Sequence, residues 1–141
     1  MTVKKMKVCF LAFYDDRGHI LLNHRKDGLK EDEDYWEIMG GSIEQGELPV
    51  EAIKREIKEE LNYEVSEVKD NLSFVEQFQL SDRNIQFEVY YYKAIFPGLH
   101  ELSDSDEVFI SDLKTFSLEE ALSLNLLPIC RYILEWTKLR L

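Results

Sequence analysis

Three glutamates in one helical stretch are the side chains of this sequence that could do chemistry together. Glu56, Glu59 and Glu60 are spaced i, i+3 and i+4, so on an α-helix their carboxylates fall on one flank, within an arc of roughly 100°. Like charges at this spacing repel unless a cation lies among them, and carboxylate oxygens are the ligands that hard divalent cations prefer. The spacing indicates a metal site, although a solvated acidic face is the more common explanation for such a motif taken alone.

The helix that would carry these glutamates is predicted between Pro49 and Asn62. Proline is tolerated in the first turn, where its missing N–H does no harm, and asparagine can adopt the left-handed conformation that ends a helix. An apolar stripe recurs at helical spacing along one face, formed by Val50, Ile53, Ile57 and Leu61. This stripe predicts that the helix packs on a sheet, whatever its acidic flank does.

Strands are expected on both sides of this helix. β-forming segments occur at residues 7–14, 19–24, 35–39, 72–80, 85–96 and 108–116. Polar turns at 15–18 and 81–84 predict a hairpin at each place, with surface loops at 25–34 and 98–107. Ser117 and Glu120 have the spacing of a capping box that starts a short helix. A last helix is predicted from Pro128, where apolar residues recur at helical spacing.

The composition favours one globular domain over residues 1–141. The chain is 45% hydrophobic and has a formal net charge of -11, which argues against a basic surface that grips nucleic acid. Cys9 and Cys130 lie in apolar contexts without a CxxC spacing, so both are expected to be buried and free. The apolar run at 8–14 is too short to cross a membrane and no cleavage site follows it, which predicts a cytoplasmic protein.

The segment around the three glutamates is similar to a known motif. Eight residues match the Nudix box, written G-x5-E-x7-R-E-U-x-E-E-x-G-U with U a bulky apolar residue, and they are Gly41, Glu47, Arg55, Glu56, Ile57, Glu59, Glu60 and Tyr63. Asn62 replaces the last glycine of the box, a mild departure because asparagine tolerates a positive φ. Met39 stands where proline is common before the box. The chain therefore resembles the Nudix (MutT-like) hydrolase family over nearly its whole length.

The resemblance implies an α/β protein with the Nudix fold, an α/β/α sandwich around a central mixed β-sheet. It also implies metal-dependent cleavage of a pyrophosphate bond in a nucleoside diphosphate linked to another group, here most simply a small nucleoside triphosphate. The cofactor would be Mg²⁺ or Mn²⁺, which suits a carboxylate site that also meets phosphate oxygens.

The resemblance assigns roles to the matching residues. Metal ligands carried over onto this sequence are Glu56, Glu59, Glu60 and the backbone carbonyl of Gly40 or Gly41. The general base that deprotonates the attacking water is expected to be Glu107 in the acidic loop, or else Glu59 or Glu60.

Other residues would support the site without doing chemistry. Glu47 and Arg55 resemble a pair that ties the loop to the helix and so positions the carboxylates. Gly41 would let the backbone turn tightly near the metal or substrate. Arg25 resembles a position at which many relatives have a cation near the substrate phosphates. The alternative is that Arg25 is a solvated charge in a loop.

Some alternatives stay open from the sequence. Tyr90 and Tyr92, or the pair Val89 and Tyr91, could line a base-stacking cleft or simply pack in the sheet. The fold could also serve a catalytically silent nucleotide sensor or protein-interaction module. The presence of all three box glutamates favours the enzyme. The expected partners are a small nucleotide and, through the exposed aromatic hairpin, a second copy in a homodimer, with neither membrane nor stable nucleic-acid binding.

Overall fold

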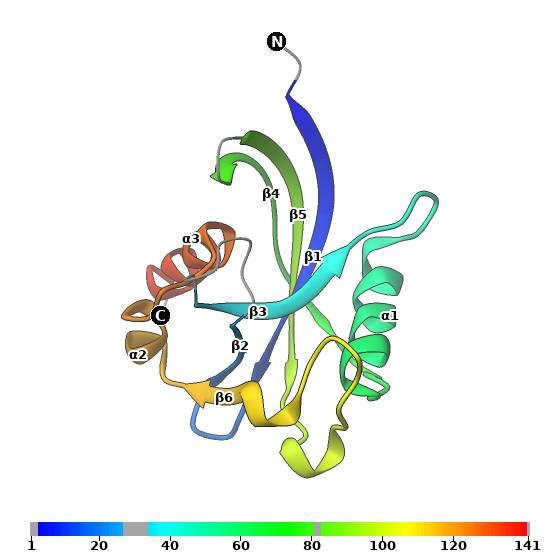
Figure 1. Cartoon of the computed structure of the whole chain (residues 1–141), viewed down its shortest axis with the longest axis vertical. Helices are drawn as coiled ribbons and strands as arrows, with labels where there is room; N and C mark the ends of the chain where they lie inside the picture. Colours follow the sequence, from blue (N-terminus) through cyan, green and yellow to red (C-terminus); the bar gives the residue numbers. More distant parts are fainter. Residues whose placement is uncertain (1–2, 27–33, 81–82, 141) are drawn as a thin grey trace.

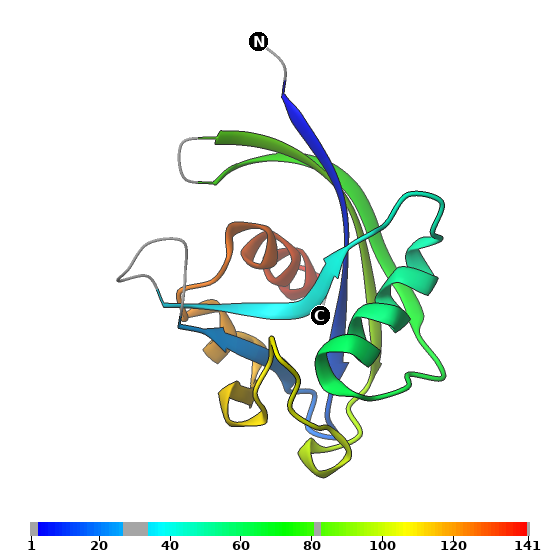
Figure 2. The ribbon, with the colours of Figure 1, turned by 45° about the vertical axis from the view of Figure 1, so that its right-hand side comes forward.

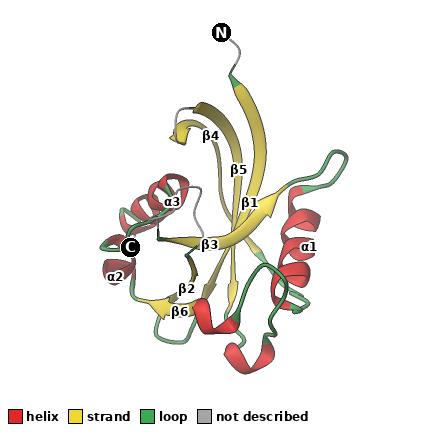
Figure 3. Ribbon diagram, in the orientation of Figure 1, coloured by secondary structure: helices red, strands yellow, loops and turns green. Residues whose placement is uncertain are grey.

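The protein is built on one curved sheet with helices on both of its faces (Figure 1). The computed structural model describes residues 3–26, 34–80 and 83–140. Its strands run in the order β4-β5-β1-β3-β2-β6. Their bounds are β1 Lys4–Tyr14, β2 Ile20–Arg25, β3 Tyr35–Ser42, β4 Lys69–Leu80, β5 Arg83–Ile95 and β6 Leu113–Phe116. The helices are α1 Pro49–Leu61, α2 Leu118–Leu122 and α3 Pro128–Lys138, with short 3₁₀ turns η1 Leu99–Glu101 and η2 Ile110–Asp112 (Figure 3).

The central strand β1 explains why helices cover both faces of the sheet. Its residues alternate between two hydrophobic cores, with Phe10 and Ala12 in one and Leu11 and Phe13 in the other. A strand buried on both faces needs an apolar layer on each side. Helix α1 supplies one layer, and α2 with α3 supplies the other (Figure 2). Because β1 pairs parallel with β5 and antiparallel with β3, the sheet is mixed. The predicted α/β/α sandwich is confirmed.

Helix α1 has the stripe and the end that its sequence predicts. Ile53, Ile57 and Leu61 are fully buried against the sheet. Asn62 is in the left-handed conformation at φ 53°, and its backbone N–H donates to the Lys58 carbonyl. The Asn62 side-chain amide also donates to the Asp104 carbonyl at 2.9 Å. This bond fastens the acidic loop before β6 to the end of α1.

The first predicted hairpin is correct at its turn and wrong beyond it. Strands β1 and β2 pair only where Tyr14 meets Ile20, because β3 enters between them and pairs with both. The turn itself is held by Asp15, whose carboxylate accepts hydrogen bonds from the backbone N–H groups of Arg17 and His19. The β4–β5 hairpin is confirmed, although Arg83 and Asn84 of the predicted turn already belong to β5 and residues 81–82 lie outside the described part.

The strand predicted at 108–116 is wrong over its first half. Only Leu113–Phe116 is extended in the sheet, and η2 precedes it. The cause is local side-chain bonding that competes with a sheet ladder. The Asp104 carboxylate accepts from the Ile110 N–H at 2.7 Å, and the Ser105 hydroxyl accepts from the Val108 N–H at 3.0 Å.

The C-terminal helices follow the sequence closely. Ser117 accepts from the Glu120 N–H while the Glu120 carboxylate accepts from the Ser117 N–H, so the capping box is confirmed. None of the described helices is long and apolar enough to cross a membrane. Arg25, predicted to begin a loop, instead ends β2 opposite Tyr35. Residues 27–33 of that predicted loop lie outside the described residues.

Candidate active site

The acidic flank of α1 faces β3, and its three glutamates differ in burial. Glu60 is buried, with 6% of its surface exposed. The Glu56 side chain is 15% exposed, and that of Glu59 is 59% exposed. Burial of the apolar stripe fixes which face of α1 lies against the sheet. The acidic flank beside that face therefore extends from the solvent to the sheet. Three carboxylates of the same chemical type therefore differ in solvent exposure: Glu59 is the most exposed, Glu56 is intermediate and Glu60 is buried.

Glu60 lies in an unusual electrostatic environment. Its Oε1 atom is buried and has no hydrogen-bond partner among the described residues. Burial raises the pKa of this carboxyl to about 9, and the negative charges of Glu56, Glu37 and Glu107 push it the same way while Arg25 opposes them. A buried carboxylate without donors is costly unless a proton or a cation compensates it.

Arg55 joins the loop after β3 to the helix. Its guanidinium donates twice to the Glu47 carboxylate, at 2.7 and 3.1 Å, and once to the Ser42 carbonyl at 2.9 Å. The same group also donates to Glu56 at 3.0 Å and to Glu59 at 3.2 Å. These bonds lower the pKa of Glu47. Of the pair expected to position the carboxylates, Arg55 is thus in contact with Glu56 and Glu59.

Gly41 matters for a different reason from the one expected. It does not turn the chain, because it lies within β3, and the positive φ of 82° that turns the loop belongs to Gly46. A Cβ on Gly41 would overlap the Glu56 carboxyl, and one on Gly40 would overlap the Cys9 carbonyl of β1. Glycine is needed at these positions for close approach rather than for a turn.

A second ion pair borders the buried glutamate. Arg25 of β2 donates to Glu37 of β3 at 3.2 Å. The charges of both residues act on Glu60, which places them at the same site. Sequence reasoning singled out Arg25 and missed Glu37. Glu37 could have been found from the sequence, because it is the one acidic residue in a predicted strand that is otherwise uncharged.

Glu107 comes to this site from the loop before β6. Its negative charge acts on both Glu56 and Glu60. Asp104 is in the same loop, but its carboxylate accepts a hydrogen bond from the Ile110 N–H. The bond from Asn62 to this loop keeps it beside the helix, so residues distant in sequence share one electrostatic environment.

The residues fit a hard divalent cation by the chemistry of their donor set. All candidate donors are oxygens, one carboxylate oxygen is buried without a partner, and the space that a Gly41 side chain would fill is taken by the Glu56 carboxyl. Over the described ranges, no three His, Cys, Asp or Glu side chains stand in the arrangement of a preformed metal site. Arg55 holds two of the carboxylates, so they would have to turn from it toward an ion.

A cleft lies beside β3, and we call it the β3 cleft. Its volume is about 350 Å³. It shares Glu37, Gly40 and Gly41 with the acidic site, and Phe78, Arg83 and Phe87 also line it. The two residue pairs considered from the sequence do not line it. Val89 and Tyr91 pack in the core under α3, whereas Tyr92 packs in the core under α1 with Tyr90 partly buried against it. Ordinary sheet packing is therefore the correct reading of those residues.

Comparison with known proteins supports one family. The model of the NUDIX domain matches residues 4–137. Among solved structures, the ORF135 protein of Escherichia coli is 26% identical, with a TM-score of 0.69 over 98% of this chain and 92% of that one. A MutT NUDIX hydrolase from Burkholderia pseudomallei is also 26% identical, with a TM-score of 0.68 over 94% of this chain and 97% of that one.

Another relative is similar over part of the chain. The dihydroneopterin triphosphate diphosphatase of Escherichia coli K12 is 28% identical over 87 residues, which are 62% of this chain and 51% of that protein. The matched segment thus covers about half of the relative's length.

Proposed function

The chain belongs to the NUDIX family, and from this premise we propose that it is a metal-dependent hydrolase of a pyrophosphate bond in a nucleoside diphosphate linked to another group. The observation that carries the proposal is Glu60, a buried carboxylate with an oxygen that has no partner among the described residues, beside Glu56. Such a group is suited to a cation and costly without one.

Four groups would hold the ion, which would be Mg²⁺ or Mn²⁺. They are the carboxylates of Glu56, Glu59 and Glu60 and the backbone carbonyl of Gly40. When bound, the ion neutralises charge on the pyrophosphate and polarises its phosphoryl oxygens. Arg55 and Glu47 would keep the carboxylates in place from outside the ligand set.

The remaining chemistry falls to charged residues around this centre. Arg25 would donate hydrogen bonds to a substrate phosphate, a task that suits a guanidinium. Glu107 would accept the proton of the attacking water, because it stands in the loop that faces Glu56 and Glu60. Glu59 or Glu60 could take this role instead, and comparing the three glutamine variants separates the candidates.

The preferred substrate is a small nucleoside triphosphate or a related nucleotide. The β3 cleft offers two aromatic rings, Phe78 and Phe87, and the cation Arg83 next to the acidic site, as a base and a phosphate chain require. The name of the similar diphosphatase, which refers to a triphosphate, supports the same class.

The proposed setting of the enzyme is the cytoplasm. The free buried thiols of Cys9 and Cys130 suit a reducing compartment. We keep the homodimer as part of the proposal, with the β4–β5 hairpin as its contact, and expect no stable binding to nucleic acid in view of the net charge of -11.

The test is a substrate panel with purified protein. Nucleoside triphosphates, nucleotide sugars and dinucleoside polyphosphates are incubated with Mg²⁺ or Mn²⁺, and the phosphate products are identified. We expect Glu59→Gln and Glu60→Gln to lower turnover by about 10²- to 10³-fold while the fold survives, because they act on a charged transition state. Glu64→Gln is the matched control, since Glu64 is exposed just beyond α1.

The opposite result has a definite meaning. If the whole panel stays intact while a nucleotide still binds, the protein is a catalytically silent sensor. If both variants turn over as fast as the wild type, Glu59 and Glu60 do not belong to the site.

A further inference from the structure

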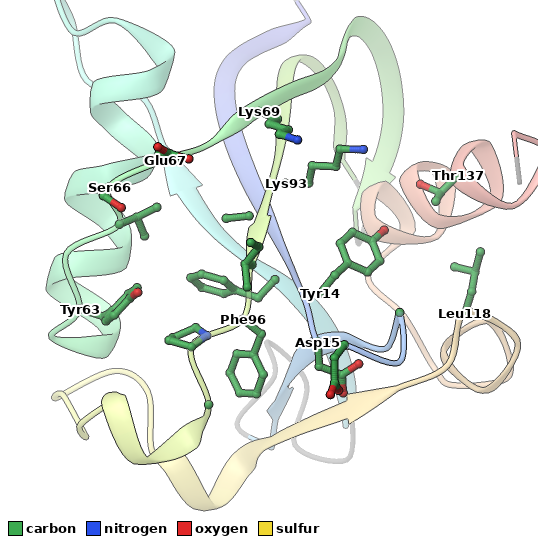
Figure 4. Close-up of a pocket in the computed structure, with 18 of the residues that line it drawn as sticks. Tyr14, Asp15, Tyr63, Ser66, Glu67, Lys69, Lys93, Phe96, Leu118 and Thr137 are labelled. Atoms are coloured by element: carbon green, nitrogen blue, oxygen red, sulfur yellow. The ribbon is translucent and has the colours of Figure 1, made fainter.

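A larger cavity lies at the other end of the strands, and we call it the end cleft. Its volume is about 1220 Å³. Residues from the ends of β1 and β5, from the start of β4 and from the last turn of α3 line it (Figure 4). It shares no lining residue with the β3 cleft, and none of the site glutamates lines it. The volume exceeds that of a usual small-molecule pocket, which is roughly 300–1,000 Å³.

Two lysines face each other across the strands at this cleft. Lys69 of β4 is the register partner of Lys93 of β5, and like charges directly opposite destabilise a sheet. Neither ammonium group has an ion-pair partner in the described part of the chain. The arrangement is notable because acidic residues outnumber basic ones by 28 to 17. Two uncompensated cations held side by side fit an anion that carries two charges.

A third cation joins them from the turn just after α3. The Arg140 guanidinium lies 4.0 Å from the centroid of the Trp136 ring and donates to the Trp136 carbonyl at 3.1 Å. No carboxylate of the described residues pairs with it. The cleft thus receives positive charge from β4, β5 and the turn after α3 together.

The acids of the cleft do not cancel this charge locally. Figure 4 shows Asp15 at the opposite end from Lys69 and Lys93, with Tyr14 between them. The Asp15 carboxylate is engaged by the backbone N–H groups of its own turn. Asp16 and Glu67 also line the cleft and are exposed, but neither is paired with either lysine in the described residues.

Aromatic and apolar side chains lie on the same face of the sheet as the lysines. Tyr14 is the register partner of Ile95, and Ile95 stands two residues from Lys93, so all three side chains point to the α3 face. The Tyr14 hydroxyl lies 3.4 Å from that of Tyr91, which fixes its ring. Ile95 is 86% exposed. From Lys93 to Ile95 the strand advances about 7 Å, so a phosphate held at the lysines leaves room for an aromatic group beside Ile95.

We propose that the end cleft binds a small aromatic phosphate monoester. The phosphate lies between Lys69 and Lys93, and the ring lies against Tyr14, Ile95 and Trp136. A monoester carries close to two negative charges at neutral pH, which matches the two lysines. Nucleoside monophosphates and simple aryl phosphates share this chemistry. The inference does not depend on the proposed hydrolysis.

The test measures binding to the full chain in EDTA, so that no turnover takes place. Phenyl phosphate, adenosine 5′-monophosphate and inorganic phosphate are titrated by calorimetry, and backbone amide shifts locate the ligand. We expect shifts at residues 93–98 and 136–140, and weaker binding of phosphate alone. Lys69→Gln and Lys93→Gln should each raise Kd about tenfold, whereas Lys5→Gln, an exposed lysine of β1 outside both clefts, should not.

The same measurements can overturn the proposal. The proposal is overturned if no ligand binds or if the amide shifts are confined to the β3 cleft. It is also overturned if Lys93→Gln leaves Kd as unchanged as Lys5→Gln does, or if inorganic phosphate binds as tightly as phenyl phosphate. Tighter binding of the adenosine compound assigns the site to nucleotides, and equal binding assigns it to aryl phosphates generally. Because the readout is binding without metal, it stands whether or not the α1 site proves catalytic.

Discussion

At the scale of single residues, Glu60 connects stability with function. Its carboxyl is buried, and one of its oxygens lacks a partner in the described chain. Folding must therefore desolvate an acid that gains no hydrogen bond in return. Strained or costly groups of this kind are typical of functional sites, where a ligand supplies the missing interaction.

We therefore predict that Glu60→Gln makes the protein more stable in EDTA while it lowers turnover by about 10²- to 10³-fold. Replacing the acid by a neutral amide of the same shape should raise the free energy of unfolding by about 1 kcal/mol or more. Urea denaturation in EDTA measures this change, with Glu64→Gln as the control. A loss of stability in Glu60→Gln would show that its carboxyl makes a favourable contact in the fold.

Glu47 provides a prediction about pH. Its pKa is lowered, chiefly by the hydrogen bonds from Arg55, so its stabilising contribution is present above the ordinary glutamate pKa and is lost as pH falls through the lowered value. The wild type should consequently lose more stability than Glu47→Gln does between pH 5 and pH 3, a range that begins above the ordinary glutamate pKa of about 4.3 and ends below it. Denaturation curves across this range test it, and parallel acid limbs would contradict it.

At the scale of elements, the end of α1 decides where the loop with Glu107 lies. Asn62 both adopts the left-handed conformation that ends the helix and donates its side-chain amide to Asp104. The backbone of the loop is tied there as well, because the Ser103 N–H donates to the Leu61 carbonyl at 3.0 Å. A helix cap thus also positions the proposed base.

Replacing Asn62 separates these two tasks. Asn62→Ala should cost about 1–2 kcal/mol, since alanine disfavours the positive φ and loses the side-chain bond. Asn62→Gly should recover most of the stability but not the bond, so amide exchange at residues 103–108 should quicken in both variants. Exchange that stays at wild-type rates would mean that the Asn62 amide does not hold the loop.

At the scale of the whole molecule, β4 is one of the two edge strands of the sheet in the described structure, and β6 is the other. An edge strand presents unpaired backbone groups to a second chain. Val75, in the middle of β4, is 53% exposed. The proposed homodimer would form here, by pairing of two β4 strands.

We expect the wild type to sediment as a dimer and Val75→Lys to sediment as a monomer, because a charge at an edge opposes strand pairing. Leu99→Lys is the control, as Leu99 is an exposed apolar residue outside the sheet. A monomeric wild type, or a dimer that survives Val75→Lys, would rule out this contact.

The single-domain organisation over 1–141 also stays a prediction, which limited proteolysis can test.

The amino-acid sequence by itself determined the features that depend on near neighbours. The position and apolar face of α1, the left-handed end at Asn62 and the capping box of α2 all follow from spacings of three or four residues, and local hydrogen bonding enforces them. The β4–β5 hairpin likewise depends on a short turn between two β-forming runs. The box residues led from these elements to the family and its fold.

Only the tertiary structure decided which distant residues meet. Strand β3 entered between β1 and β2, which brought Glu37 to Glu60 and made Gly41 a place of close approach instead of a turn. Asp104 and Ser105 shortened β6 by capping their own loop. The end cleft assembled side chains from three strands and two helices. Such contacts depend on strand order and burial, which are set by the packing of the whole chain and leave no fixed spacing in the sequence.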